Sequence, residues 1–335
     1  MVMTNAIHVI VLAAGKGTRM KSGLAKVLHP VFFAPMICHV LAAVKPLAPA
    51  ETVVVTGHQA VRVEEVLAAY PVCFVRQKEQ LGTGHAVLIA EKALRGKSGL
   101  AVILCGDTPL VRATTLQAMV NEHLLQQQTL SVMTTIVSDP THYGRIVTNA
   151  QSSGIERIVE EKDATADERL ILEINAGIYC VDLGFLFAAL SQVGTNNRQG
   201  EVYLTDIVGI ARMKNIEVGR FVCSDPLEIT GVNSRVELAR ANSIMQQRRN
   251  QALMLDGVTM IHPDSIFIEN SVIIGQDTEI HSHCLLAGNT VIGESCLLEP
   301  FCKLVDCQVQ DHQIIKSFSN LQNQSITSDF GQSGP

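Results

Sequence analysis

The feature that most restricts the fold is a six-residue repeat in the C-terminal part of the chain. An aliphatic residue recurs at every sixth position, and a small residue follows three of these positions. This period is typical of a parallel β-helix, in which stacked repeats bury a continuous core. The aliphatic positions are Ile268, Ile274, Ile280, Leu286, Ile292, Leu298 and Leu304, and the small residues are Gly275, Ala287 and Gly293.

The repeat loses its phase at Gln310, and residues 310–335 are rich in Gln, Asn and Ser. We therefore expect a short hexapeptide-repeat β-helix over residues 257–309. It would have little more than about two coils if each coil takes about three hexads. An irregular or disordered tail is expected over residues 310–335.

Residues 1–232 follow a different pattern, because short apolar runs alternate with helical segments. This alternation predicts an α/β domain with right-handed connections, a mostly parallel sheet and helices on both faces. A long helix with a polar middle should occupy the linker 233–256. The expected strands are Ile7–Leu12, Thr52–Thr56, Val72–Val75, Leu100–Leu104, Ser131–Ile136, Ile178–Val181 and Val218–Val222, and the expected helices include Met36–Val44, Ala60–Ala69, Gly84–Ala93 and Thr114–Gln127.

Composition argues against several classes of function. The chain has 335 residues, enough for about two domains, and its 47% hydrophobic content argues against global disorder. Its net charge of −6 argues against binding of nucleic acid or acidic membranes. Nine cysteines without a Cys-x-x-Cys pair are typical of reduced thiols. With no signal-peptide pattern and no apolar run of membrane-spanning length, a soluble, cytoplasmic protein is expected.

A glycine loop follows the first predicted strand. Gly15 and Gly17 can adopt positive φ and present backbone N–H groups to a phosphate, while Arg19 and Lys26 add positive charge. The P-loop string is absent, and Met20 stands where a dinucleotide fingerprint needs its third glycine. The loop therefore indicates a triphosphate site, with a simple strand-to-helix turn as the alternative.

Polar residues follow two further predicted strands, at the edge where ligands of such sheets bind. Gln77, Gly82 and Thr83 precede a helix and could contact a base edge through amide and backbone groups, or form an ordinary loop with a threonine cap. His85, at the start of that helix, is interpreted as structural. Asp107 suits a Mg²⁺ ligand, with a helix cap or turn as the alternative.

Three polar positions lie further along the chain. Asn233 could be a second Mg²⁺ ligand or only the cap of the long helix, and the spacing does not decide between them. Glu160 and Asn175 could hydrogen-bond sugar hydroxyls or an acetamido group. The neighbouring Glu161 and Asp163 are interpreted as a solvated face.

Together these motifs resemble one family, the bacterial N-acetylglucosamine-1-phosphate uridyltransferases, which usually form the first half of a bifunctional protein. The resemblance covers about residues 6–305. Its strings are Leu12–Met20, Lys26–His29, Gln80–Ala86, Tyr143–Ile146, Lys162–Thr165, Glu173–Asn175 and Gly231–Asn233. The resemblance implies a Rossmann-like nucleotidyltransferase domain followed by a left-handed β-helix, and association as a homotrimer through that β-helix.

The resemblance also implies a reaction. UTP and N-acetylglucosamine 1-phosphate would give UDP-N-acetylglucosamine and pyrophosphate, by in-line attack on the α-phosphorus of UTP with Mg²⁺. Arg19 would stabilise the departing pyrophosphate, and Lys26 the phosphates at the reacting centre. Asp107 and Asn233 would hold the Mg²⁺. The nucleotide would contact Leu12, Ala13, Ala14, Gly15, Gln77, Gly82 and Thr83, and the sugar would contact Gly144, Glu160, Asn175 and Tyr203.

The chain departs from the family pattern on the sugar side. Cys105 stands where relatives often have Tyr, Ala176 where they often have Thr, and Val202 where a second aromatic residue is common. Another hexose 1-phosphate, such as glucose 1-phosphate, with UTP or dTTP, therefore stays open as the substrate pair, as does a non-catalytic regulatory role. Because the expected β-helix is short, we expect no acetyltransferase activity of the kind found in the bifunctional relatives.

Overall fold

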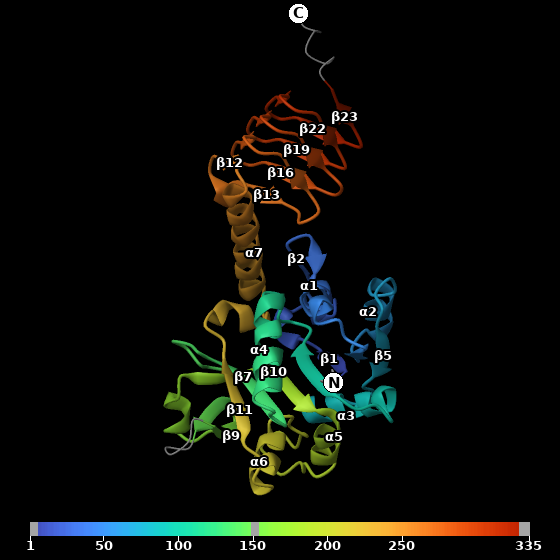
Figure 1. Cartoon of the computed structure of the whole chain (residues 1–335), viewed down its shortest axis with the longest axis vertical. Coiled ribbons are helices and arrows are strands. Elements are labelled where there is room, and N and C mark those ends of the chain that lie inside the picture. Colours follow the sequence, from blue (N-terminus) through green and yellow to red (C-terminus); the bar gives the residue numbers. More distant parts are fainter. Residues whose placement is uncertain (1–5, 149–153, 328–335) are drawn as a thin grey trace, which may run out of the picture. The chain divides into compact units, whose positions relative to one another are not determined.

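The computed structural model describes residues 6–148 and 154–327 (Figure 1). These residues form two compact units. The first contains residues up to 237 except 31–33, and the second contains residues 31–33 and those from 238 onward. The division falls in the first turn of helix α7 (Arg235–Leu255), slightly later than the boundary predicted at residue 232.

The first unit is built on one large sheet, with the main strand order β11-β7-β10-β6-β1-β4-β5. Strand β1 lies between β4 and β6 and is parallel to both, so that Val9 has Thr52 on one side and Val102 on the other. The predicted mostly parallel sheet is confirmed. The strands of the main path are β1 (Ile7–Ala13), β4 (Glu51–Thr56), β5 (Cys73–Arg76), β6 (Leu100–Cys105), β7 (Leu130–Ile136), β10 (Glu173–Asp182) and β11 (Val218–Val222).

Helices cover both faces of this sheet. Val9 and Val11 of β1 pack into one core with α1 and α4, and Ile10 packs into a second core with α3, α5 and α6. Burial on both faces explains why the strand is a continuous apolar run. The helices are α1 (Met36–Val44), α2 (Ala60–Val66), α3 (Thr83–Leu94), α4 (Ala113–Leu125), α5 (Leu183–Leu190) and α6 (Asp206–Met213).

Short elements complete the first unit. Strands β8 (Arg145–Thr148) and β9 (Ile155–Val159) form an antiparallel pair, and β8 joins the large sheet where Arg145 lies opposite Ile174 of β10. Strands β2 (Pro30–Val31) and β3 (Ala34–Pro35) form a small hairpin. The 3-10 helices are η1 (Thr18–Met20), η2 (Lys26–Leu28), η3 (Lys45–Leu47), η4 (Glu168–Leu170) and η5 (Pro226–Ile229), with η6 (Pro263–Ser265) in the second unit.

Strand β10 is the exception in an otherwise parallel centre, because it runs antiparallel to both β6 and β7. Asp182, its last residue, lies opposite Leu100, the first residue of β6. The beginning of β10 therefore lies toward the carboxyl end of β6. A residue near the start of β10, such as Asn175, is thereby placed at the ligand-binding edge without following a strand.

The second unit contains the predicted stack of parallel strands. Each turn of the stack contributes one two- or three-residue strand to each of three parallel sheets. The first sheet contains β12 (Thr259–Met260), β15 (Glu279–Ile280), β18 (Leu297–Leu298) and β21 (Ile314–Ile315). The second contains β13 (Phe267–Ile268), β16 (Leu285–Ala287), β19 (Lys303–Val305) and β22 (Asn320–Gln322). The third contains β14 (Ile273–Ile274), β17 (Val291–Ile292), β20 (Gln308–Val309) and β23 (Ser325–Ile326).

Two predictions about this stack are wrong. Each sheet has four strands among the described residues, so the stack exceeds the expected two coils. The predicted irregular tail, 310–335, contains β21, β22 and β23, whereas its last residues, 328–335, lie outside the described part. The cause is a shortened corner: Leu304 and Val309 occupy successive inward positions only five residues apart. The repeat changes phase there and continues through Ile315 and Leu321.

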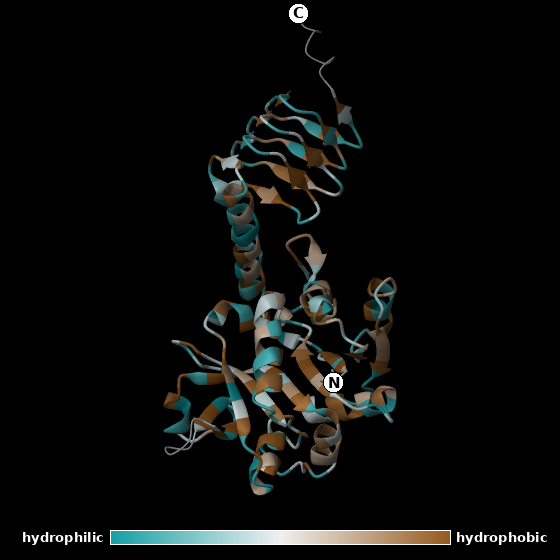
Figure 2. Ribbon diagram, in the orientation of Figure 1, coloured by the Kyte–Doolittle hydropathy of each residue, from teal (hydrophilic) through white to brown (hydrophobic). Residues whose placement is uncertain are grey.

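Helix α7 is as polar as the sequence predicted, and Figure 2 shows its hydrophilic surface beside the hydrophobic strands of the stack. Two of its amides are buried against the first turn of that stack. Gln246 donates to the carbonyl oxygens of Asp264 and Ile266 at 2.9 and 2.8 Å, and Asn250 donates to those of Pro263 and Ile266 at 2.8 and 2.9 Å. Within residues 6–148 and 154–327, no helix has the length and apolar character needed to cross a membrane.

Candidate active site

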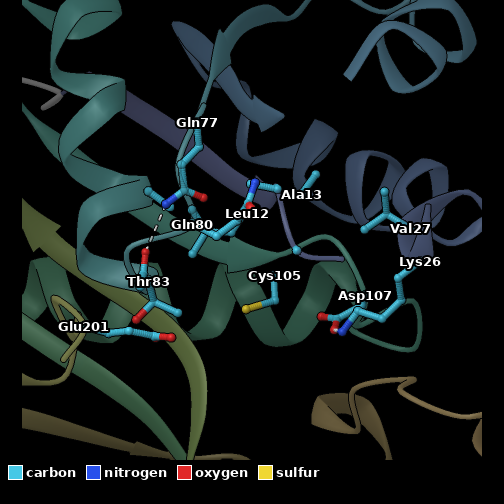
Figure 3. Close-up of a pocket in the computed structure, with 14 residues that line it drawn as sticks. Leu12, Ala13, Lys26, Val27, Gln77, Gln80, Thr83, Cys105, Asp107 and Glu201 are labelled. Atoms are coloured by element: carbon cyan, nitrogen blue, oxygen red, sulfur yellow. Dashed lines mark hydrogen bonds and ion pairs between the residues drawn. The ribbon is translucent and has the colours of Figure 1, made fainter. Parts of the chain in front are cut away.

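An open cavity of about 290 Å³ lies where β1, β5 and β6 end (Figure 3). It contains every residue predicted to contact the nucleotide, together with Lys26 and Asp107. Figure 3 shows Gln77 and Thr83 at one end, Lys26 and Asp107 at the other, and Cys105 between them. The lining residues are Leu12, Ala13, Ala14, Gly15, Lys26, Val27, Gln77, Gln80, Gly82, Thr83, Ala86, Cys105, Asp107 and Glu201.

The glycine loop leaves β1 and returns toward the cavity through η2. Gly17 is in the left-handed region, with φ of +61°, and a Cβ there would lie 2.6 Å from the Cβ of Lys26. Glycine is therefore required both for the turn and for the close approach of Lys26. The loop brings the lysine side chain to the cavity edge.

The Lys26 ammonium joins the two residues predicted to hold Mg²⁺. Its Nζ donates to Oδ2 of Asp107 and, at 3.0 Å, to Oδ1 of Asn233. The side chains of Lys26 and Asp107 are each 16% exposed, so the pair is largely shielded from water. Two residues separated by more than a hundred positions in the chain thus direct oxygen atoms at one cation.

The cap of helix α7 is formed by Ser234, the residue after Asn233. Ser234 and Glu237 form a capping box: the Glu237 N–H donates to Oγ of Ser234 at 3.3 Å, and the Ser234 N–H donates to Oε2 of Glu237 at 2.8 Å. The Asn233 N–H also donates to Glu237. Ser234 therefore caps the helix. The side-chain amide oxygen of Asn233, Oδ1, accepts a hydrogen bond from Lys26.

The opposite end of the cavity is held by contacts between two loops. Gly82 has φ of +108°, and a Cβ there would lie 2.5 Å from the carbonyl oxygen of Val202. The Gly84 N–H donates to that same oxygen at 2.8 Å. Gln77 is only 4% exposed, and its Nε2 donates to the carbonyl oxygen of Gly82 at 3.2 Å. Nδ1 of His85 lies 3.1 Å from the same Nε2, which supports the structural interpretation of that histidine.

Three of the four predicted sugar residues form a second cluster. The Asn175 N–H donates to the carbonyl oxygen of Gly144 at 2.9 Å. A Cβ on Gly144 would lie 3.7 Å from Oε1 of Glu160 and 3.7 Å from the Cβ of Asn175. Thr205 donates to Oε1 of Glu160 at 3.1 Å, and burial raises the pKa of that carboxyl. The cluster therefore brings together a carboxylate from Glu160 and an amide from Asn175.

Comparison with known proteins identifies the family of this chain. A model of the MobA-like NTP transferase domain matches residues 9–169. A protein from Desulfotalea psychrophila named bifunctional protein GlmU is 44% identical over 325 residues, which cover 97% of this chain and 96% of that protein. The chain belongs to the GlmU family. A GlmU from Geotalea daltonii is 45% identical over 306 residues, which cover 91% of this chain and 67% of the relative.

Solved structures show the same fold at lower identity. A UDP-glucose pyrophosphorylase in complex with UDP-glucose has a TM-score of 0.59 and 20% identity, and the match covers 73% of this chain and 100% of that one. A protein described as a glucose-1-phosphate thymidylyltransferase of Bacillus anthracis has a TM-score of 0.58 and 22% identity, covering 71% of this chain and 95% of that one. At these identities the likeness establishes the fold alone.

Six predicted residues of this GlmU-family chain lie outside the cavity lining, namely Arg19, Gly144, Glu160, Asn175, Tyr203 and Asn233. Arg19 is exposed on η1. Tyr203 is buried, and its hydroxyl accepts from Gln199 at 2.7 Å and donates to Oδ2 of Asp163 at 3.3 Å. Asp163 is thus a partner within the fold and not only part of a solvated face. Glu161 likewise pairs with the buried Arg145 at 2.6 Å.

The residues of the GlmU-family cavity or its support that were not predicted as contacts include Gln80, Glu201 and Thr205. Gln80 and Glu201 line the cavity, and both stand in polar loops whose neighbours had been singled out. Thr205 supports Glu160 from the turn before α6. Cys105 also lines the cavity, and burial raises its thiol pKa to about 12.

Proposed function

We propose that this chain transfers a uridylyl group from UTP to N-acetylglucosamine 1-phosphate, giving UDP-N-acetylglucosamine and pyrophosphate. The observation that carries the proposal is that Asp107 and Asn233 both accept hydrogen bonds from the Lys26 ammonium. Lys26 and Asp107 lie at the end of the cavity opposite Gln77 (Figure 3). Membership of the GlmU family supports the same reaction class.

The chemistry of the donor set fits Mg²⁺. Asp107 and Asn233 supply a carboxylate and an amide oxygen, which are hard ligands, and the Lys26 ammonium stands between them as a cation would. Among the described residues, no group of three or more His, Cys, Asp and Glu side chains could hold a metal. Two protein ligands are the usual number for a Mg²⁺ that also binds substrate phosphates. When bound, the ion would neutralise charge on those phosphates.

The remaining work falls to positioning and charge. The amide of Gln77 and the backbone around Gly82 hold the base at one end of the cavity, and the glycine loop receives the triphosphate at the other. Lys26 stabilises the charge that develops at the α-phosphate, and Arg19, on the exposed side of the loop, stabilises the departing pyrophosphate. Reactions of this type need oriented reactants more than a covalent intermediate.

Pyrophosphate release from UTP and N-acetylglucosamine 1-phosphate tests the proposal. We expect Asp107→Ala to lose on the order of 100-fold or more in kcat, because a charged group at the reacting phosphates is removed. The control is Asp256→Ala, an exposed aspartate after α7, which should retain wild-type turnover. Faster release with glucose 1-phosphate would contradict the proposed sugar, and no release with any sugar 1-phosphate would indicate a non-catalytic protein.

A further inference from the structure

Tyr179 is a buried tyrosine that bonds a residue of the proposed sugar cluster. Its side chain is 2% exposed, and its hydroxyl oxygen accepts a hydrogen bond from Nδ2 of Asn175 at 2.7 Å. The proposed reaction assigns it no role. Desolvation by burial raises its pKa well above the ordinary value, so the hydroxyl stays neutral wherever the protein is folded.

The backbone between these two residues is built to bring them together. In a regular strand, residues four apart are about 13 Å apart along the strand. Strand β10 is irregular here, because its register with β7 shifts between Asn175 and Tyr179. Gly177 lies inside the shift with φ of +72°, a conformation that glycine adopts without strain. The bulge shortens the strand locally and lets the phenol reach the amide.

The same bulge fixes the orientation of the amide. The Gly177 N–H donates to Oδ1 of Asn175 at 2.9 Å, while Nδ2 donates to Tyr179. One partner for each end of the amide determines which end is oxygen and which is nitrogen. An asparagine held in this way keeps one N–H and one carbonyl lone pair for a ligand.

The backbone that carries the fixed amide lies next to the other groups of the cluster and, at Gly177, next to a residue that lines the cavity. The Gly144 carbonyl oxygen accepts a hydrogen bond from the backbone N–H of Asn175. Both Glu160 and Asn175 lie on the side of Gly144 where a Cβ would project. A Cβ on Gly177 would lie 3.6 Å from Sγ of Cys105, which lines the cavity. The Asn175 amide holds a donor and an acceptor apart in one plane, which complements the amide of a 2-acetamido group. The hydroxyl of a 2-hydroxy sugar carries its donor and acceptor on one oxygen and is a poorer match.

We propose that Tyr179 is a positioning residue that holds the Asn175 amide in the orientation needed to select a 2-acetamido sugar phosphate over its 2-hydroxy analogue. The inference rests on the proposed function, because it assumes that Asn175 contacts the sugar. Tyr179 itself does not touch the reacting atoms. The Gly177 N–H determines which end of the amide is oxygen, and the contribution of Tyr179 is to hold the nitrogen end in place before the substrate arrives.

The test is Tyr179→Phe, which removes one oxygen and leaves the ring in the core. Loss of a neutral hydrogen bond of about 1 kcal/mol corresponds to roughly a fivefold effect. We expect the KM for N-acetylglucosamine 1-phosphate to rise about fivefold, with the KM for UTP within about twofold of wild type. The preference for this sugar over glucose 1-phosphate, measured as a ratio of kcat/KM, should fall by a similar factor.

Tyr70→Phe is the matched control. Its hydroxyl also bonds a side chain, the Cys38 thiol, but it lies away from the cavity lining. This variant should leave both KM values and the sugar preference unchanged, and thermal unfolding of both variants would confirm that they are folded.

Three outcomes would overturn the inference. An unchanged sugar KM and sugar preference in Tyr179→Phe would refute it while wild-type turnover left the proposed function standing. If the KM values for UTP and for the sugar phosphate rose equally in Tyr179→Phe, and the Tm fell, Tyr179 would be only structural. A wild-type protein that releases no pyrophosphate from any sugar 1-phosphate would refute the proposed function, and this inference with it.

Discussion

At the scale of single residues, Arg145 illustrates how a buried charge holds the backbone beside the sugar cluster. Its side chain is 2% exposed, and its guanidinium donates to the carbonyl oxygen of Tyr143 and to Oε2 of Glu161. Tyr143 immediately precedes Gly144, so this arginine fixes the peptide next to a proposed sugar contact. The carboxylate of Glu161 compensates the buried charge.

Removing that compensation should be costly. We expect Glu161→Gln to lower the free energy of unfolding by about 2–3 kcal/mol, because a buried guanidinium would lose its counter-charge. The comparison is Glu156→Gln, which breaks an exposed pair with Arg212 and should cost less than about 1 kcal/mol. Chemical denaturation followed by circular dichroism measures both, since the chain has no tryptophan. Equal effects of the two substitutions would contradict this account.

Much of the site could be predicted at this scale, because it depends on residue type and on position after a strand. Gln77 and Asp107 follow parallel strands, and Gly17 stands where only glycine fits. Pairs formed by packing could not be predicted. Tyr179 meets Asn175 only because of a bulge, and Arg145 meets Glu161 across two strands. Neither contact leaves a periodic signal in the sequence.

At the scale of elements, the hydrophobic pattern of helix α7 does not reveal which of its faces packs against the strand stack. The sequence predicted its length but gave no amphipathic stripe, because the residues it buries include the amides of Gln246 and Asn250. These amides satisfy three carbonyl oxygens at the open start of the strand stack. The helix thus covers an end of the stack with hydrogen bonds in place of apolar contact.

We expect Gln246→Ala to lower the free energy of unfolding of the second unit by about 1–3 kcal/mol, because the Asp264 carbonyl oxygen would lose the Gln246 donor and the Ile266 oxygen would keep only Asn250. Gln251→Ala, on the exposed side of the same helix, should change it by less than about 0.5 kcal/mol. Hydrogen exchange of the amides in β12 and β13 would report the loss locally. Equal protection in both variants would show that the amides do not stabilise this end.

At the scale of the whole molecule, stability should depend on pH through a buried histidine. His123 is 4% exposed, its Nδ1 lies 2.8 Å from Oγ of Ser131, and burial lowers its pKa to about 4. In the unfolded chain the pKa is about 6.5, so between these values the unfolded state binds more protons. The stabilisation is therefore complete above about pH 6.5 and is lost as the pH falls toward 4.

This linkage predicts that His123 alone lowers the free energy of unfolding by about 2 kcal/mol when the pH falls from 7.5 to 5. Replacing it by glutamine, which does not titrate, should reduce the pH dependence by that amount even if the variant is less stable at both values. Denaturant unfolding of the first unit at the two pH values measures the difference. An identical pH dependence in the variant would mean that His123 is protonated without cost.

The fold as a whole was predictable in its first unit, where each predicted strand is found, since two-sided burial leaves a clear apolar run. In the second unit, the number of turns in the strand stack was underestimated. There the inward positions change phase at the corner between Leu304 and Val309, and again at the equivalent corner of the next turn, between Leu321 and Ile326. A search for a fixed six-residue period stops at such a corner, although the stack of strands continues beyond it.

That corner has a consequence for how the second unit can change in evolution. The turn around Gly288 and the shorter turn around Asp306 occupy equivalent places, and both residues have positive φ, +67° and +54°. The strands on either side still pair in register. Single-residue deletions are therefore tolerated at the corners, whereas the same deletion inside a strand would turn every following side chain to the wrong side. Relatives should differ in length at the corners and keep the strands intact.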